Sequence, residues 1–143
     1  MPPRILIVDD EERFRLTLGK RLAERGLEVG ATVGTGMEAL QELRENAYDV
    51  VVLDVKMPGL DGIQTLEEIK KINPHIEVLL LTGHASVDAA VDGMRLGAYD
   101  YLMKPCEIEV LLDKITGAYE IKAGREERIR QAEERSRTDQ GPA

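Results

Sequence analysis

The sequence predicts an α/β protein built on a five-stranded parallel sheet with helices on both faces. Five short apolar runs recur along the chain, and three of them consist almost entirely of Val, Ile and Leu. Such runs are typical of parallel strands that are buried on both faces. The stretches between them have the three- and four-residue spacing of amphipathic helices. Strand and helix therefore alternate five times, and the crossovers in such a chain are right-handed.

The predicted strands cover residues 5–8, 29–33, 50–53, 78–81 and 101–103. A helix is expected after each strand, and turn chemistry marks most of the helix ends. Gly26 and Gly97 follow the first and fourth helices, and Pro74 follows the third. Thr35 and Ser86 are the expected N-caps of the second and fourth. The apolar residues that define the five helices are Phe14, Leu18 and Leu22; Ala39, Leu40 and Leu43; Ile63, Leu66, Ile69 and Ile72; Val87, Ala90, Val91 and Met94; and Ile108, Leu111, Leu112, Ile115 and Tyr119.

The amino-acid composition indicates which residues form the core and which partners the charge of the chain favours. Apolar residues make up 43% of the chain and charged residues 32%, while aromatic residues reach only 3%. The core must therefore be aliphatic. The net charge is −8, and acidic and basic residues balance from Glu120 onward, so the whole excess lies in residues 1–119. A body this acidic should not bind nucleic acid directly by bulk electrostatics, and it should attract cations.

Nothing in the sequence predicts export or membrane insertion. No apolar run approaches the roughly 18 residues that span a bilayer. The apolar stretch near the N-terminus has four residues, too few for the core of a signal peptide. The single Cys106 cannot form an internal disulfide, which fits a reducing compartment. We therefore expect a cytoplasmic protein that does not contact the membrane.

Polar residues follow four of the five predicted strands at their carboxyl ends, where ligands bind in open α/β sheets. Asp9 and Asp10 follow the first strand, Asp54 the third, Thr82 the fourth and Lys104 the fifth. Each has an ordinary structural reading when taken alone: Asp9 or Asp10 as a helix N-cap, Asp54 as the start of a turn, Thr82 and Lys104 as strand termini. Those separate readings do not explain why all five converge on one rim.

The residue types on this rim point to phosphoryl chemistry. Three carboxylates repel one another, so a site that holds them together normally contains a cation. Because all the candidate ligands are oxygens, a hard cation such as Mg²⁺ is expected rather than Zn²⁺. The Thr82 hydroxyl and the Lys104 ammonium suit phosphate oxygens. A metal, a carboxylate nucleophile and phosphate ligands together describe phosphoryl transfer to an aspartate.

Several short motifs resemble the receiver domain of two-component response regulators, in the same order along the chain. The motifs are Asp9-Asp10, Asp54 within Leu-Asp-Val-Lys-Met-Pro-Gly at 53–59, Thr82-Gly83, Tyr101 and Lys104-Pro105. The resemblance covers residues 4 to about 120. Residues 97–102, Gly-Ala-Tyr-Asp-Tyr-Leu, are especially similar to receivers of transcriptional activators that carry a central ATPase.

The resemblance implies a fold and a metal site. The fold would be flavodoxin-like and doubly wound, with strand order 2-1-3-4-5 and five helices, so the first and third strands would be neighbours. Asp54 would be the phosphoacceptor. Asp10, Asp54 and the backbone carbonyl of Lys56 would coordinate Mg²⁺ directly, and Asp9 would act through water.

The resemblance also implies a phosphate site and a switch. Lys104 and Thr82 would hold the phosphoryl oxygens, and Gly83 would leave room and a backbone N–H for them. Tyr101 would turn inward when Thr82 moves toward the phosphate. The Lys104–Pro105 peptide bond would be cis.

The expected function is a phosphorylation-controlled signalling receiver rather than a metabolic enzyme. A sensor histidine kinase or phosphotransfer protein would supply the phosphoryl group, and the chain would catalyse only its own phosphorylation and dephosphorylation. One alternative is a phosphohydrolase with an aspartyl-phosphate intermediate, but such enzymes place a second acid where this chain has Lys56. Another is a phosphate-independent interaction module. The chain has no room for a DNA-binding or ATPase domain, so we expect a single-domain regulator or a fragment of a longer one.

The C-terminal segment differs from the rest. We expect a receiver domain over residues 1–120 and a charged helical extension with a disordered tail over 121–143. Opposite charges spaced four residues apart support the helix weakly, and Gly124 opposes it. We predict that the last helix continues past Ile121 to near Arg135 and supports a weak homodimer.

Overall fold

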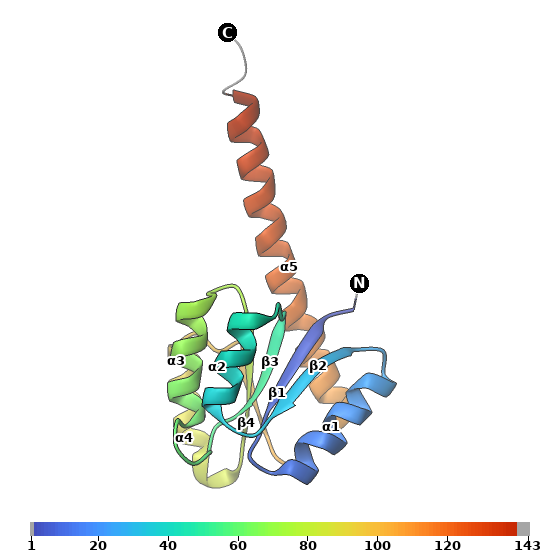
Figure 1. Cartoon of the computed structure of the whole chain (residues 1–143), viewed down its shortest axis with the longest axis vertical. Helices are drawn as coiled ribbons and strands as arrows, with labels where there is room; N and C mark the ends of the chain where they lie inside the picture. Colours follow the sequence, from blue (N-terminus) through green and yellow to red (C-terminus); the bar gives the residue numbers. More distant parts are fainter. Residues whose placement is uncertain (1, 140–143) are drawn as a thin grey trace.

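The computed structural model describes residues 2–139, apart from the side chains of His84, Thr138 and Asp139. Within this range five parallel strands form one sheet in the order β2-β1-β3-β4-β5 (Figure 1). The strands are β1 Arg4–Val8, β2 Glu28–Val33, β3 Val50–Asp54, β4 Glu77–Thr82 and β5 Asp100–Met103. The predicted strands and their order are confirmed, and each predicted end lies within one residue of the observed one.

A helix follows each strand in the described part of the chain. The helices are α1 Glu12–Glu24, α2 Gly36–Glu45, α3 Gly62–Ile72, α4 Val87–Arg95 and α5 Ile108–Asp139, and a short 3-10 helix, η1 His84–Ser86, precedes α4. The five predicted helices are therefore confirmed. The 3-10 turn was not expected from the sequence.

The observed helix ends agree with the predicted caps in some places and not in others. The Thr35 hydroxyl accepts a hydrogen bond from the Glu38 N–H at 3.1 Å, as an N-cap should. Gly26 follows α1 with a φ of 90°, a conformation that favours glycine. The predicted cap at Ser86 is wrong, because its side chain makes no capping bond and its backbone is not extended. Ser86 instead ends the 3-10 turn that leads into α4.

The sheet is covered on both faces, and alternate strand residues point to opposite sides. In β1, Ile5 and Ile7 pack with α1 and α5, while Leu6 and Val8 pack with α2, α3 and α4. Figure 1 shows these two helical layers on either side of the sheet. Tyr48 is the one aromatic residue among the buried hydrophobic residues of the described chain, so the predicted aliphatic core is confirmed.

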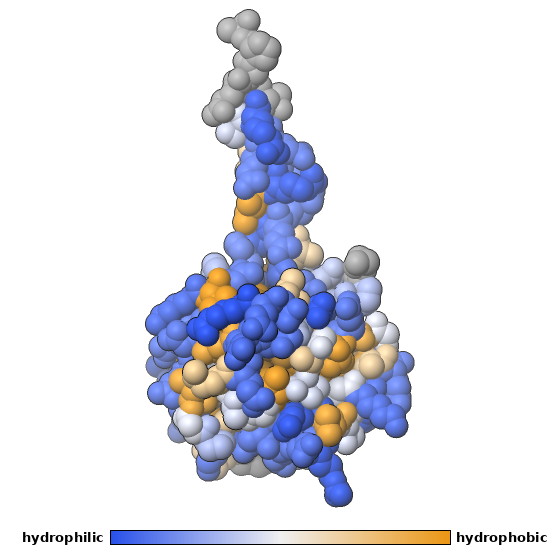
Figure 2. All heavy atoms as spheres, in the orientation of Figure 1, coloured by the Kyte–Doolittle hydropathy of each residue, from blue (hydrophilic) through white to orange (hydrophobic). Residues whose placement is uncertain are grey.

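Helix α5 extends far beyond the body of the molecule (Figure 1). It passes residue 120 without a break and continues to Asp139, past the predicted end near Arg135. Figure 2 shows this extension as mainly hydrophilic. No helix within residues 2–139 is both long and apolar enough to cross a bilayer. The division at residue 120 stays a prediction, and the expected tail at 140–143 lies outside the described residues.

Two ion pairs fasten α5 to the end of the sheet opposite the carboxyl rim. The Lys122 ammonium is buried and lies 3.0 Å from Asp49, and it also pairs with Glu126. The Arg125 guanidinium lies 3.1 Å from the buried carboxylate of Glu77. Asp49 precedes β3 and Glu77 begins β4. The root of the extension is therefore attached to two central strands.

Candidate functional site

The acidic pair lies at the carboxyl end of β1, beside the end of β3. Asp9 is buried, and its Oδ1 accepts a hydrogen bond from the Glu11 N–H at 2.9 Å. Asp10 is exposed. Helix α1 begins at Glu12 with Glu11 in the N-cap position. Neither aspartate occupies that cap position, so the ordinary structural reading of this pair is wrong.

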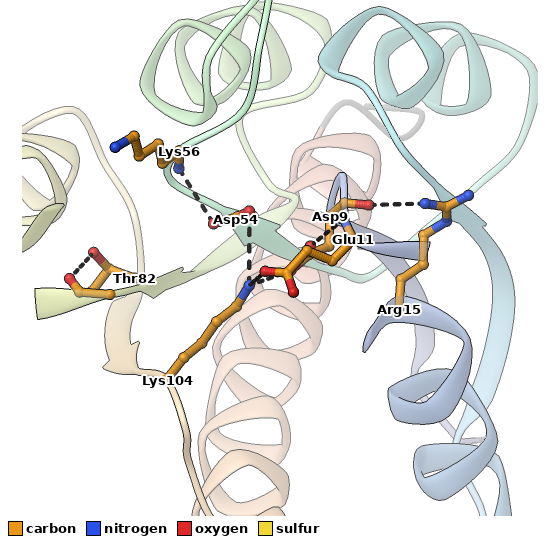
Figure 3. A network of polar contacts seen from close by, with 8 residues as sticks. Asp9, Glu11, Arg15, Asp54, Lys56, Thr82 and Lys104 are labelled. Atoms are coloured by element: carbon orange, nitrogen blue, oxygen red, sulfur yellow. Dashed lines mark hydrogen bonds and ion pairs between the residues drawn. The ribbon is translucent and has the colours of Figure 1, made fainter. Parts of the chain in front are cut away.

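Asp54 is the last residue of β3, and only 6% of its surface is exposed. Its Oδ1 accepts the backbone N–H of Lys56 at 3.3 Å (Figure 3). Gly62, at the start of α3, lies so close that a Cβ there would be 2.2 Å from the Asp54 carbonyl oxygen. The glycine therefore lets α3 start directly against the end of β3. Sequence reasoning assigned no such role to Gly62.

The three aspartates converge, and a lysine ammonium lies with them. One carboxylate oxygen each from Asp9, Asp10 and Asp54 lies within 4.8 Å of the other two. The Lys104 Nζ is 2.6 Å from Asp9 Oδ2 and 3.8 Å from Asp54 Oδ2 (Figure 3). It is also 3.8 Å from Glu11, which sequence reasoning did not place in the site. The structure thus brings together four of the predicted rim residues.

Burial and charge shift the protonation of the two central groups. Burial, and then the negative charge of Asp9, raise the pKa of Asp54 from 3.8 to about 7, although Lys104 and the Lys56 N–H oppose this. Burial also disfavours the charge on Lys104. The hydrogen bond to Asp9 and the nearby carboxylates outweigh that effect and raise the pKa of Lys104. The lysine is therefore a cation, whereas Asp54 titrates near neutral pH.

Thr82 and Gly83 lie on the same rim, in a conformation that does not engage Asp54. Thr82 is the last residue of β4 and is fully buried, and its hydroxyl donates to the Gly83 carbonyl at 3.0 Å. Figure 3 shows this hydroxyl apart from the carboxylates. In the described part of the chain, a Cβ at Gly83 would meet no atom within 4 Å, so there is open space at this position. Tyr101, in the edge strand β5, is half-buried against the core cluster that α2, α3 and α4 cover.

A cavity of about 640 Å³ lies over this rim, and its lining includes Asp10, Asp54, Lys56, Gly83, Ser86 and Lys104. The presence of Ser86 in the lining follows from the 3-10 turn that precedes α4. The Lys104–Pro105 bond is cis, as the resemblance implied.

Arg15 donates a hydrogen bond to the Asp9 backbone carbonyl at 3.2 Å (Figure 3). The sequence did not indicate that Arg15 and Ser86 lie at this site, because their places there depend on contacts in the folded chain.

The donor set fits a hard divalent cation. The cluster of Asp9, Asp10 and Asp54 offers carboxylate oxygens, which Mg²⁺ prefers. Three carboxylates share the site with one ammonium, and that leaves negative charge for a cation to compensate.

The fold and this rim define the class of protein. Residues 5–116 match the family model described as the response regulator receiver domain. The chain therefore belongs to the receiver domains of response regulators, which are signalling modules of two-component systems.

Curated relatives are similar over most of this chain. The transcriptional regulatory protein ZraR of Klebsiella oxytoca is 43% identical over 107 residues, which are 75% of this chain and 24% of ZraR. The response regulator protein FleR of Pseudomonas aeruginosa is 43% identical over 115 residues, which are 80% of this chain and 24% of FleR. The chain thus spans about a quarter of the length of these relatives.

Solved structures show the same fold. A response regulator receiver domain from Clostridium thermocellum is 39% identical with a TM-score of 0.80, and the match covers 85% of this chain and 97% of that one. NtrX from Brucella abortus, solved in complex with ADP, is 33% identical with a TM-score of 0.81, over 89% of this chain and 29% of that one. The response regulator StyR is 28% identical with a TM-score of 0.86, over 100% of this chain and 72% of that one.

Proposed function

We propose that Asp54 accepts a phosphoryl group from a sensor histidine kinase or a phosphotransfer protein, and that this modification switches a partner or output surface. The observation that carries the proposal is the convergence of the Asp9, Asp10 and Asp54 oxygens within 4.8 Å, with the Lys104 ammonium beside them. A buried carboxylate with only a structural role at a strand end would not need two further carboxylates and an ammonium around it.

The chemistry follows from the surroundings of Asp54. An ionised Asp54 oxygen attacks the donor phosphorus, the bond from phosphorus to the donor nitrogen or oxygen breaks, and an acyl phosphate forms. The Lys104 ammonium, already within 3.8 Å of Asp54, stabilises the negative charge on the transferred oxygens. The open space at Gly83 leaves room for those oxygens.

Asp10, Asp54 and the backbone carbonyl of Lys56 would hold Mg²⁺ at this site, and Asp9 would act through water. When bound, it supplies positive charge against the repulsion between carboxylates and phosphoryl oxygens. A positive charge next to Asp54 also lowers its pKa, so a larger fraction of Asp54 is ionised and nucleophilic at neutral pH.

The switch uses the two residues that do not yet engage the acid cluster. The Thr82 hydroxyl must leave the Gly83 carbonyl to reach a phosphoryl oxygen. This movement frees space for Tyr101, which is half-buried in β5, to turn inward. Lys104 and Thr82 then hold the phosphoryl group from the ends of two neighbouring strands, β5 and β4.

The output of this receiver lies with a partner or with chain outside residues 1–143. Relatives named as transcriptional regulators are more than four times as long as their match to this chain. The acidic body, with the −8 net charge, supports the prediction that residues 1–143 do not themselves bind nucleic acid. Cytoplasmic location and the lack of membrane contact stay predictions.

Intact-mass analysis with a small phosphodonor tests the proposal and separates its alternatives. We expect a gain of one phosphoryl group that requires Mg²⁺ and is lost in Asp54→Asn. Steady release of phosphate from phosphomonoesters would instead indicate a phosphohydrolase. A chain that gains no phosphoryl group with Mg²⁺ present would be a phosphate-independent interaction module.

A further inference from the structure

The Lys104 ammonium also contacts an aromatic ring. Its Nζ lies 4.3 Å from the centroid of Phe14, a half-buried residue in the first turns of α1. A cation at this distance is attracted by the negative face of the ring. The same ammonium donates to Asp9 at 2.6 Å and lies 3.8 Å from Asp54. One conformation of the Lys104 side chain therefore makes the ring contact and also brings the ammonium close to Asp54.

Core packing alone does not account for this contact. Phe14 does pack against the cluster between the sheet and helices α1 and α5, and it lines a cavity of about 120 Å³ with Leu18, Cys106 and Ile108. That role requires only an apolar side chain of suitable size. Lys104, however, is a long side chain with several rotatable bonds, and holding its end in one place costs conformational entropy. An attractive ring offsets part of that cost.

We propose that Phe14 is a positioning residue for phosphoryl transfer, whose ring holds the Lys104 ammonium within reach of Asp54. This role rests on the proposed function, because it matters only if Lys104 stabilises a phosphoryl group on Asp54. Weakening the electrostatic attraction of the ring should slow phosphorylation even where the shape of the side chain is kept.

The composition of the chain allows a selective test. Phe14 is the only phenylalanine in the sequence, so biosynthetic incorporation of fluorinated phenylalanines changes this position alone. Fluorine withdraws electrons from the ring face and changes its size little. From phenylalanine through 4-fluoro- to 3,4,5-trifluorophenylalanine, we expect the initial rate of Asp54 phosphorylation by a small phosphodonor with Mg²⁺ to fall stepwise, by about two- to fivefold in total. A small donor is used because its reaction reports the chemistry at Asp54 without the binding of a partner protein.

A second set of variants separates packing from charge. The Phe14→Leu protein should be phosphorylated as slowly as the trifluorinated protein. Phe14→Trp should restore the rate of phosphorylation, because the tryptophan ring attracts cations more strongly than the phenylalanine ring. Equal rates across the fluorinated series would overturn the positioning role and leave Phe14 as a packing residue. Failure of the unsubstituted protein to gain a phosphoryl group on Asp54 would contradict the proposed function itself.

The ring contact is also tested without metal or phosphodonor. In the 4-fluorophenylalanine protein, position 14 supplies a single ¹⁹F resonance. Lys104→Met should move this resonance, whereas Lys20→Met, which removes an exposed lysine from the same helix, should not. If both variants leave the resonance in place, the ammonium does not reside over the ring and the proposal is wrong.

Discussion

Lys104 donates a hydrogen bond to Asp9 across 2.6 Å, while the nearer carboxylate oxygen of Asp54 lies 3.8 Å from the same ammonium. The lysine is thus bound more closely to the acid pair than to the proposed phosphoacceptor. A phosphoryl group on Asp54 would place new anionic oxygens in reach of this ammonium. Movement of Lys104 from Asp9 toward the phosphoryl group would then carry the signal to β5, whose last residue directly precedes Lys104.

Lys104→Ala should separate phosphorylation from the switch. We expect the variant to become modified, more slowly than wild type, but to lose most of the chemical-shift change at Thr82 and Tyr101 on phosphorylation. NMR spectra with and without a phosphoryl mimic measure this response, and Lys20→Ala should respond like wild type. A full wild-type response in Lys104→Ala would contradict the coupling.

The stability of the metal-free protein should depend on pH through Asp54. The folded protein holds the pKa of Asp54 at about 7, above its ordinary value of 3.8. Between about pH 4 and 7 the folded state therefore keeps a proton that the unfolded chain has released. The free energy of unfolding must fall as pH rises through this window and level off above it. Asp54→Asn removes this effect, so it should be more stable than wild type at pH 8, by about 4 kcal/mol at most.

Urea unfolding of both proteins in EDTA at pH 4, 6 and 8 measures this difference. The advantage of Asp54→Asn should shrink toward zero as the pH falls to 4. Asp113→Asn, which changes an exposed aspartate on α5, serves as the control for the substitution itself. A constant difference between wild type and Asp54→Asn at every pH would show that Asp54 does not titrate in this range.

The strands and most of the rim could be predicted because simple rules govern them. A run of Val, Ile and Leu indicates a buried parallel strand, and the carboxyl ends of parallel strands meet at one edge. Asp9, Asp54 and Lys104 therefore converge as expected. The direction of the Thr82 hydroxyl could not be predicted, because the neighbouring carbonyl of Gly83 competes for it.

Contacts between segments far apart in the sequence could not be predicted from local sequence patterns. Lys122 looked like one charge among many in the extension, yet it is buried against Asp49 in the folded chain. The position of Phe14 in the helical pattern indicated an apolar packing residue, and its contact with Lys104 depends on where β5 ends. Such pairings are properties of the packed structure.

Lys122→Ala should destabilise the protein, because it leaves the partly buried Asp49 carboxylate without its charge partner. We expect a loss of about 1–3 kcal/mol in the free energy of unfolding. Arg130→Ala removes an exposed cation that pairs with Glu127 and Glu134 on the same helix, and it should have a much smaller effect. Urea denaturation of the two variants checks this. Equal losses would show that Lys122 does not fasten α5.

The α5 extension should support a weak homodimer. Beyond the ion pairs at its root, residues 126–137 of the helix are all exposed, Ile129 among them, so this part of the helix needs a partner surface to persist. Sedimentation of the full chain and of a chain ending at Glu126, each with and without a phosphoryl mimic, tests this. The shorter chain keeps Lys122 and Arg125, which pair with Asp49 and Glu77, so we expect it to fold. Monomers in all four samples would contradict the dimer.

Chemical trapping of the modified residue identifies the phosphoacceptor directly. The protein is treated with a small phosphodonor and Mg²⁺, and borohydride then reduces the acyl phosphate, which converts a phosphorylated aspartate to homoserine. Peptide mass spectrometry locates that homoserine. We predict homoserine at position 54 and unchanged aspartate at Asp9 and Asp10. Homoserine at either of those positions, or a phosphorylated protein with an unchanged Asp54, would contradict it.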